Sequence, residues 1–179
     1  ASSEDMELAK EVQNIFMSKF FRVYTNDDLL GVELAGALKN IIALAAGISD
    51  GLGYGDNSRA ALITRGLTEI TRLGLSMGAK QNTFAGLAGL GDLVVTCNSR
   101  FSRNWQAGYR LGQGRKIEEV LSGTKMVVEG VSATAAACSL AKKQNVQMPI
   151  SSQLYKILFE DEPADQAFLP LIEREKTDE

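Results

Sequence analysis

The chain has 179 residues and a mass of 19.3 kDa, and 45% of its residues are hydrophobic, which is enough for a domain with its own core. A net charge of -3 and a pI near 5.2 argue against a nucleic-acid-binding surface spread over the molecule. The sequence contains no histidine, which excludes Ser-His-Asp and Cys-His hydrolysis and zinc bound by histidine. Acid-base chemistry must therefore use lysine, a carboxylate, tyrosine or water.

The N-terminal residues combine a helical pattern with a strand pattern. Apolar side chains recur at helical spacing over residues 4–19, and residues 21–25 alternate as a β-strand does. A lone strand cannot satisfy its own backbone hydrogen-bonding groups, so this pair needs a sheet. We therefore expect residues 1–27 to be the remnant of a larger α/β domain and residues 28–179 to form a separate helical unit.

The rest of the chain predicts helices separated by glycine. Asp28 is placed to cap a helix that ends near Gly47, and Ser132 and Asn145 to cap and close a later one. Short helices with tight junctions are expected at 82–97. The remaining predicted helices cover residues 29–48, 59–77, 103–111, 117–121, 132–143, 152–159 and 163–173. Only residues 126–128 offer a further strand, so the fold class is mainly α.

The cysteines and the apolar stretches bear on the compartment. Cys97 and Cys138 lie far apart without a CxxC pattern, which predicts reduced thiols in a cytoplasmic protein and no metal site. The longest apolar run is interrupted by Glu33, Lys39 and Asn40, and the first residues lack the pattern of a signal peptide. We therefore expect neither membrane insertion nor export.

Lys39 stands in the most apolar part of the sequence. A helix that is apolar nearly all round is buried, so this lysine must extend to solvent or lose its hydration. Burial disfavours a charged ammonium and makes it a better proton donor near neutral pH. Alternatively, Lys39 lies on an exposed stripe with Ala35, Gly36 and Ala43. The residues alone leave both interpretations open.

Asp92 is a lone carboxylate in the apolar stretch 90–95 and needs a cationic partner, for which Lys39 is the candidate. Such a pair would orient the ammonium and hold it charged, which opposes the effect of burial. The glycine patterns at 51–55 and 86–91 resemble dinucleotide fingerprints, but neither follows a predicted strand. We interpret them as tight turns and close helix contacts.

Between Asp92 and Glu118 the sequence has no acidic residue and five cations, which are Arg100, Arg103, Arg110, Arg115 and Lys116. With nearby hydrogen-bond donors, such a run suits a small anion such as a phosphate. A solvated helix face is the alternative. Trp105 and Tyr109 lie among the arginines, but one short run on an acidic chain does not predict a nucleic-acid partner.

Several unrelated motifs occur in one order along the chain: GALKNI at 36–41, DGLGYGDN at 50–57, GLGDL at 89–93 with Thr96 and Cys97 after it, SRN at 102–104 and VEGV at 128–131. In this the sequence resembles the C-terminal half of NAD(P)-dependent glycerol-3-phosphate dehydrogenases, closest to the bacterial type. The resemblance covers residues 29–150, and residues 1–25 resemble the last helix and strand of the Rossmann domain of that family.

The resemblance implies a multi-helix substrate domain like the C-terminal domain of 6-phosphogluconate dehydrogenase. It also implies hydride transfer between NADH or NADPH and dihydroxyacetone phosphate, giving sn-glycerol 3-phosphate for phospholipid synthesis. Lys39 would be the general acid and base and Asp92 would position it. Substrate-binding residues would be Asn40, Asp92, Thr96, Ser102, Arg103 and Asn104, and Arg103, Val127 and Glu129 would contact the cofactor. The family also implies a homodimer.

Two alternatives remain at this point. The helical unit could be a dimerisation module without catalysis, or it could belong to another two-domain hydroxyacid dehydrogenase that also uses a lysine acid. The adjacent Lys39 and Asn40 and the SRN motif at 102–104 favour a phosphorylated substrate. The phosphate-binding glycine loop of the family has no match in this chain, so we expect the chain alone to bind a dinucleotide weakly and to show negligible turnover.

Overall fold

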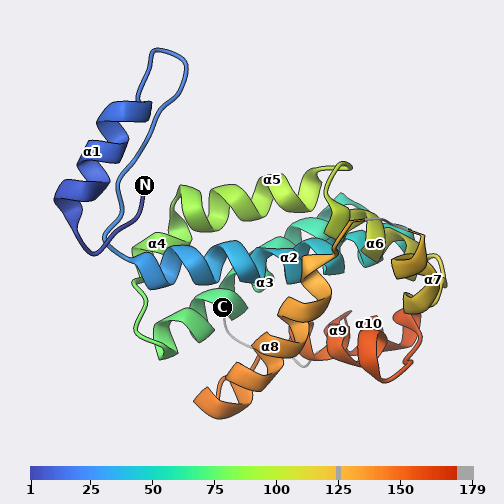
Figure 1. Cartoon of the computed structure of the whole chain (residues 1–179). Helices are drawn as coiled ribbons and strands as arrows, with labels where there is room; N and C mark the ends of the chain where they lie inside the picture. Colours follow the sequence, from blue (N-terminus) through green and yellow to red (C-terminus); the bar gives the residue numbers. More distant parts are fainter. Residues whose placement is uncertain (124–125, 173–179) are drawn as a thin grey trace.

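A computed structural model describes residues 1–123 and 126–172, and nearly all of its regular structure is helical (Figure 1). The elements are α1 (Met6–Phe16), α2 (Leu29–Gly51), α3 (Asp56–Ser76), α4 (Gln81–Ala85), the π-helix η1 (Leu87–Gly91), α5 (Asp92–Asn98), α6 (Arg103–Gly112), α7 (Ile117–Ser122), α8 (Glu129–Gln144), α9 (Pro149–Phe159) and α10 (Ala164–Ile172). The mainly α fold class is confirmed.

Helix α2 is the central element, and α3, α5, α6 and α8 all pack against it (Figure 1). The Asp28 side chain caps it as predicted, accepting a hydrogen bond from the Gly31 amide at 2.9 Å. By length and apolarity alone α2 resembles a membrane span, but every residue from Asn40 to Ser49 is buried inside this structure. A core helix has the same composition, and here that is what α2 is.

The expected end of this helix at Gly47 is wrong, because the helix continues to Gly51. Gly47 instead lies where α6 touches the backbone of α2. A Cβ on Gly47 would be 2.1 Å from the Trp105 carbonyl oxygen, and one on Gly108 of α6 would be 2.0 Å from the Leu44 carbonyl oxygen. Only glycine permits this approach. The two helices therefore lie backbone to backbone.

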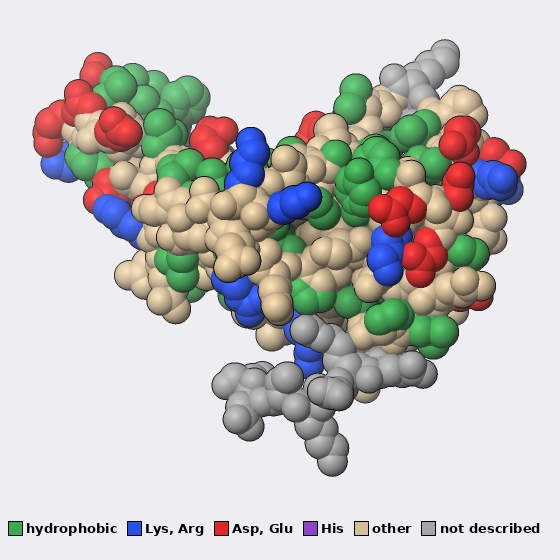
Figure 2. All heavy atoms as spheres, turned by 90° about the horizontal axis from the view of Figure 1, so that it is seen from below, with side chains coloured by type: hydrophobic (Ala, Val, Ile, Leu, Met, Phe, Trp, Pro, Cys, Tyr) green, Lys and Arg blue, Asp and Glu red, His purple; other side chains and the backbone are tan. Residues whose placement is uncertain are grey.

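The N-terminal residues form an arm that projects from the helical body (Figure 1). Helix α1 is present, but the predicted strand at 21–25 is not formed, and a single isolated bridge joins Ser2 and Asn26. A strand needs a neighbouring strand to bond with, and none is available among the residues described. Figure 2 shows apolar and acidic side chains on this arm, and Phe20 is 91% exposed.

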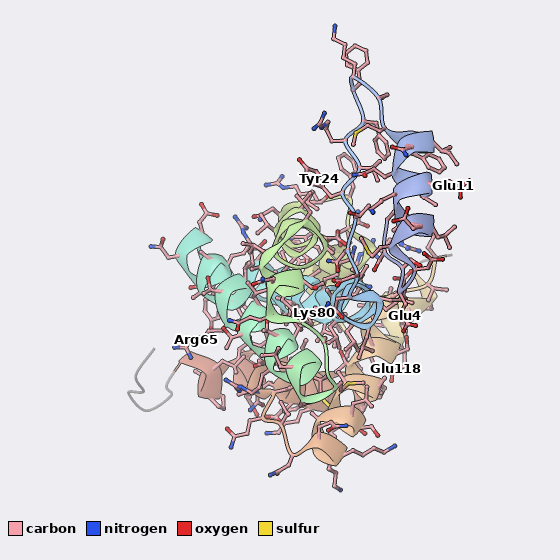
Figure 3. The ribbon with its side chains drawn as sticks, turned by 90° about the vertical axis from the view of Figure 1, so that its left-hand side faces the viewer. Glu4, Glu11, Tyr24, Arg65, Lys80 and Glu118 are labelled. Atoms are coloured by element: carbon pink, nitrogen blue, oxygen red, sulfur yellow. The ribbon has the colours of Figure 1, made fainter. Side chains whose placement is uncertain are left out.

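Asp28 also fastens the arm to the body. Its carboxylate accepts hydrogen bonds from the Lys80 amide at 2.8 Å and from the Thr83 hydroxyl at 2.7 Å, and Lys80 pairs with Asp27 at 2.6 Å. Lys80 lies at the base of the arm, and Tyr24 lies along it (Figure 3). One buried carboxylate thus holds the start of α2 to the segment that begins α4.

Other boundaries differ from the predictions through tertiary contacts. Helix α8 begins at Glu129 rather than at the predicted cap Ser132, because the Gly130 amide donates to the Asn104 side chain at 2.8 Å. Its predicted end at Asn145 is confirmed, with that residue in the left-handed conformation. Residues 126–128 form no strand. Residue 173, the last of the final predicted helix, lies outside the described residues.

Glu69 of α3 is 4% exposed and caps α9 from outside. Its carboxyl accepts hydrogen bonds from the amides of Ile150 at 2.6 Å and Ser151 at 3.3 Å. Burial raises the pKa of Glu69 to about 7, although these bonds favour the charged form.

The predicted separate thiols are present, since both cysteines are free, and burial raises the pKa of Cys97 to about 12.

The raised pKa of Glu69 predicts a stability that falls as the pH rises from about 4.5 to about 7, because in this window the folded chain holds a proton that the unfolded chain has lost. The free energy of unfolding can fall by about 3 kcal/mol across this window. Glu69→Gln should flatten this slope in urea unfolding measured across the window, whereas Glu118→Gln, on an exposed residue, should not. An unchanged slope in Glu69→Gln would contradict the assignment.

The backbone contact between α2 and α6 predicts that Gly108→Ala is destabilising by about 1–3 kcal/mol, because a methyl group there must push the helices apart. Gly36→Ala is the matched control, since a Cβ on Gly36 of α2 meets nothing within 4 Å. Alanine is the better helix former, so the control should be neutral or stabilising in thermal unfolding. Equal changes in stability at the two positions would show that helix propensity, and not the contact between α2 and α6, determines the effect of the substitutions.

Candidate active site

Lys39 and Asp92 form an ion pair between α2 and α5, with the Lys39 ammonium donating to one carboxylate oxygen of Asp92. The lysine side chain is 22% exposed and the aspartate side chain 35% exposed, so both reach the surface from a buried base. The predicted partnership is confirmed. The exposed-stripe alternative is wrong, because Ala35 and Ala43 are 1% and 0% exposed.

Asp92 is held on its other side by its own helix. The Thr96 hydroxyl donates to the Asp92 carbonyl oxygen at 2.6 Å and lies 3.3 Å from the second carboxylate oxygen. The carboxylate therefore has a partner on each oxygen, which fixes its orientation toward Lys39. Thr96, predicted to contact substrate, lies in the same cluster.

The π-helix directly before Asp92 is a feature that the sequence did not reveal. Its hydrogen bond runs from the Gly91 amide to the Gly86 carbonyl at 3.2 Å, five residues back. A Cβ on Gly89 would be 2.2 Å from the Phe84 carbonyl oxygen, so glycine is required in this turn. The expectation of close helix contacts at 86–91 is confirmed, and the turn leads straight into α5 at Asp92.

Asn40 and Asn104 form a buried amide pair next to Lys39. The Asn104 amide nitrogen donates to the Asn40 side-chain oxygen at 2.9 Å, and the Asn104 oxygen accepts from the Gly130 amide at 2.8 Å. Both asparagines are 6% exposed. Asn104 therefore joins α2, α6 and α8 and sets the orientation of the Asn40 amide.

Glu129 connects this pair to Arg103. One carboxylate oxygen accepts from the Arg103 guanidinium at 3.2 Å and the other accepts from the Asn40 amide at 3.1 Å. The Arg103 and Glu129 side chains are 41% and 54% exposed, so this bridge lies at the surface of the site. Of the remaining predicted residues, Ser102 caps α6 through the Trp105 amide at 3.3 Å, and Val127 is 71% exposed.

The cation run does not act as one group. Arg103 is the member of the run that bonds to a residue of this site in the described structure. Arg115 and Lys116 line a separate hollow of about 480 Å³ together with Asp161, Glu162 and Asp165. These acids lie about 45 residues further along the chain, so the absence of acids within the run did not predict an acid-free environment. None of the lining residues belongs to the Lys39 site.

The residues of the site come from four helices and are all within hydrogen-bonding reach of a neighbour in the site. An oriented ammonium that touches solvent suits proton transfer, and a guanidinium and an amide that share one carboxylate suit an anion. Across residues 1–123 and 126–172, no group of three or more acidic or cysteine side chains is arranged to hold a metal. The arrangement therefore contains groups of the kinds that proton transfer and anion binding use.

Comparisons with known proteins identify the family of the chain. The family model for the C-terminus of NAD-dependent glycerol-3-phosphate dehydrogenase matches residues 28–169. A glycerol-3-phosphate dehydrogenase (NAD(P)+) of Geobacillus kaustophilus is 62% identical over 99% of this chain and 52% of its own length. The enzyme of the same name from Lysinibacillus sphaericus is 63% identical over 90% of this chain and 48% of its own length.

A crystal structure of glycerol-3-phosphate dehydrogenase from Coxiella burnetii superposes with a TM-score of 0.93 at 47% identity, covering 97% of this chain and 53% of that chain. This chain therefore spans about half the length of the curated relatives that it matches. Because the family model covers most of the chain, the protein belongs to the NAD-dependent glycerol-3-phosphate dehydrogenase family and corresponds to its C-terminal domain.

Proposed function

We propose that this chain is the substrate-binding and catalytic half of an NAD(P)-dependent glycerol-3-phosphate dehydrogenase, which interconverts dihydroxyacetone phosphate and sn-glycerol 3-phosphate. The observation that carries the proposal is that Lys39, paired with Asp92, is followed directly by Asn40, which the Glu129 carboxylate links to the guanidinium of Arg103. The relatives at 62% and 63% identity bear the name of this activity. The start of the family match at residue 28 supports a helical unit from that residue on.

The substrate phosphate binds at Arg103 and Asn40. A guanidinium presents several N–H donors in one plane, and Arg103 is exposed enough to receive a dianion. Ser102 begins the same helix, whose first amides also face an anion favourably. Asn104 acts one layer below, because its two polar atoms are taken by Asn40 and Gly130, and it positions rather than contacts the ligand.

Lys39 transfers the proton. In the reducing direction its Nζ gives a proton to the oxygen on C2 as the carbonyl becomes a hydroxyl, and in the oxidising direction it takes that proton back. Asp92 keeps the ammonium aimed at this oxygen, and Thr96 holds Asp92. Anchoring the phosphate places C2 at a set distance from Lys39, which lowers the entropic part of the barrier.

The nicotinamide cofactor would contact this chain at Arg103, Val127 and Glu129. The exposed Val127 offers an apolar surface and Arg103 a cation, which suit an aromatic ring and its neighbouring phosphates. When bound, the nicotinamide supplies or accepts the hydride at C2. No βαβ unit occurs among residues 1–123 and 126–172 to seat the adenine half, so we propose that the chain alone binds dinucleotide weakly.

We also propose that the protein is cytoplasmic, forms a homodimer and serves phospholipid synthesis. Two free cysteines, one of them fully buried, fit a reducing compartment.

Size-exclusion chromatography combined with ligand titration tests the alternative of a dimerisation module. A dimer that binds no phosphate ester would favour the module. The SRN motif and the exposed guanidinium of Arg103 favour a phosphorylated substrate over that of another hydroxyacid dehydrogenase.

Lys39→Ala in the full-length enzyme that contains this chain should lower kcat by about a hundred- to ten-thousand-fold, because the oxygen on C2 loses its proton donor. The affinity for sn-glycerol 3-phosphate should change far less, since Arg103 and Asn40 remain. Steady-state kinetics with calorimetric binding separates the two effects. Lys142→Ala, an exposed lysine of α8, is the control and should keep full activity. Retained turnover in Lys39→Ala would overturn the assignment.

A further inference from the structure

The two groups proposed to bind the substrate phosphate already hold an anion that belongs to the protein. The Glu129 carboxylate spans Arg103 and Asn40 with one oxygen on each, at 3.2 Å and 3.1 Å. A phosphate group bound to the same two donors would use the same directions, because both anions accept hydrogen bonds from planar N–H donors. Glu129 thus lies in the position that the ligand needs.

The charges of the site explain why the Glu129 carboxylate and a phosphate cannot occupy the same two donors together. Lys39 pairs with Asp92 and Arg103 pairs with Glu129, so the four charged groups of the cluster sum to zero. A phosphate ester carries close to two negative charges at neutral pH. It cannot rest against the Glu129 carboxylate without like-charge repulsion, whereas removal of that carboxylate from the donors leaves a net positive site.

The bridge is also weak enough to be displaced. Arg103 and Glu129 are each about half exposed, and ion pairs in such positions contribute little because water screens them. Asn40 is different, since it is buried and held by Asn104, so its amide stays in place when Glu129 leaves. The Asn40 donor is therefore preorganised, while the Arg103–Glu129 pair above it is exposed and weakly held.

We infer that Glu129 is an internal competitor of the substrate phosphate: it occupies Arg103 and Asn40, must leave when a phosphate ester binds, and so sets the affinity of the site. The inference rests on the proposed function for the identity of the anion. It assigns Glu129 a role toward the substrate, in addition to the contact with the cofactor expected from the resemblance.

The test is an NMR titration of this chain with sn-glycerol 3-phosphate and, separately, with inorganic phosphate. Glu129→Gln should lower the Kd for both ligands roughly two- to fivefold, the size expected for an exposed ion pair. Glu118→Gln, which removes the same charge from exposed α7, is the control and should leave the Kd unchanged (Figure 3). If Glu129 instead holds Arg103 in place for the ligand, Glu129→Gln weakens binding, and this result overturns the inference.

A second measurement needs no substitution. The side-chain carboxyl ¹³C signal of Glu129 in the wild-type chain should move toward that of a free carboxylate as phosphate saturates the site. An unmoved signal at saturation also overturns the inference. If Glu129→Gln binds the ligands no more tightly than the wild type does, the competitor role is wrong and the proposed function is unaffected. If neither the wild type nor the variant binds, both the inference and the proposed function are overturned.

Discussion

The site depends on the backbone contact between α2 and α6. Gly47 and Gly108 let the two helices approach until carbonyl groups occupy the space where side chains would normally lie. Because α6 begins at Arg103, this approach brings Asn104 to Asn40, and Arg103 lies next to Asn104 in the first turn of the same helix. A separation of even one methyl group would open the Asn40–Asn104 bond, so the packing of two glycines decides whether Asn104 supports Asn40.

The polar groups of the site form two connected layers. Asn104 lies below, fully bonded to Asn40 and to the Gly130 amide at the start of α8. Glu129 and Arg103 lie above and are open to solvent. A buried amide with every hydrogen bond satisfied is rigid, whereas an exposed ion pair exchanges readily with water. This division gives a fixed amide pair below and an exposed ion pair above it.

Several predictions failed for one common reason, which is that a distant residue replaced a local signal. Gly47 looked like a helix end but is a contact with α6, and the start of α8 is set by Asn104 rather than by Ser132. The strand predicted at 21–25 failed for the converse reason, since the described residues offer it no strand to pair with. The acid-free run around Arg115 faces acids from the C-terminal part of the chain. Local periodicity contains no information on such partners.

By itself the sequence determined that this chain is mainly helical, that it contributes no imidazole to any chemistry, and that Asp92 needs a cationic partner, for which Lys39 is the candidate. These conclusions follow from composition, helical period and the cost of leaving a charge unpaired, all of which are local or elementary. Only the tertiary structure decided that Glu129 bridges Arg103 and Asn40, that Asn104 is a buried support, and that a π-turn places Asp92. Those facts depend on helix approach distances and on side chains up to 89 residues apart, which no spacing along the chain encodes.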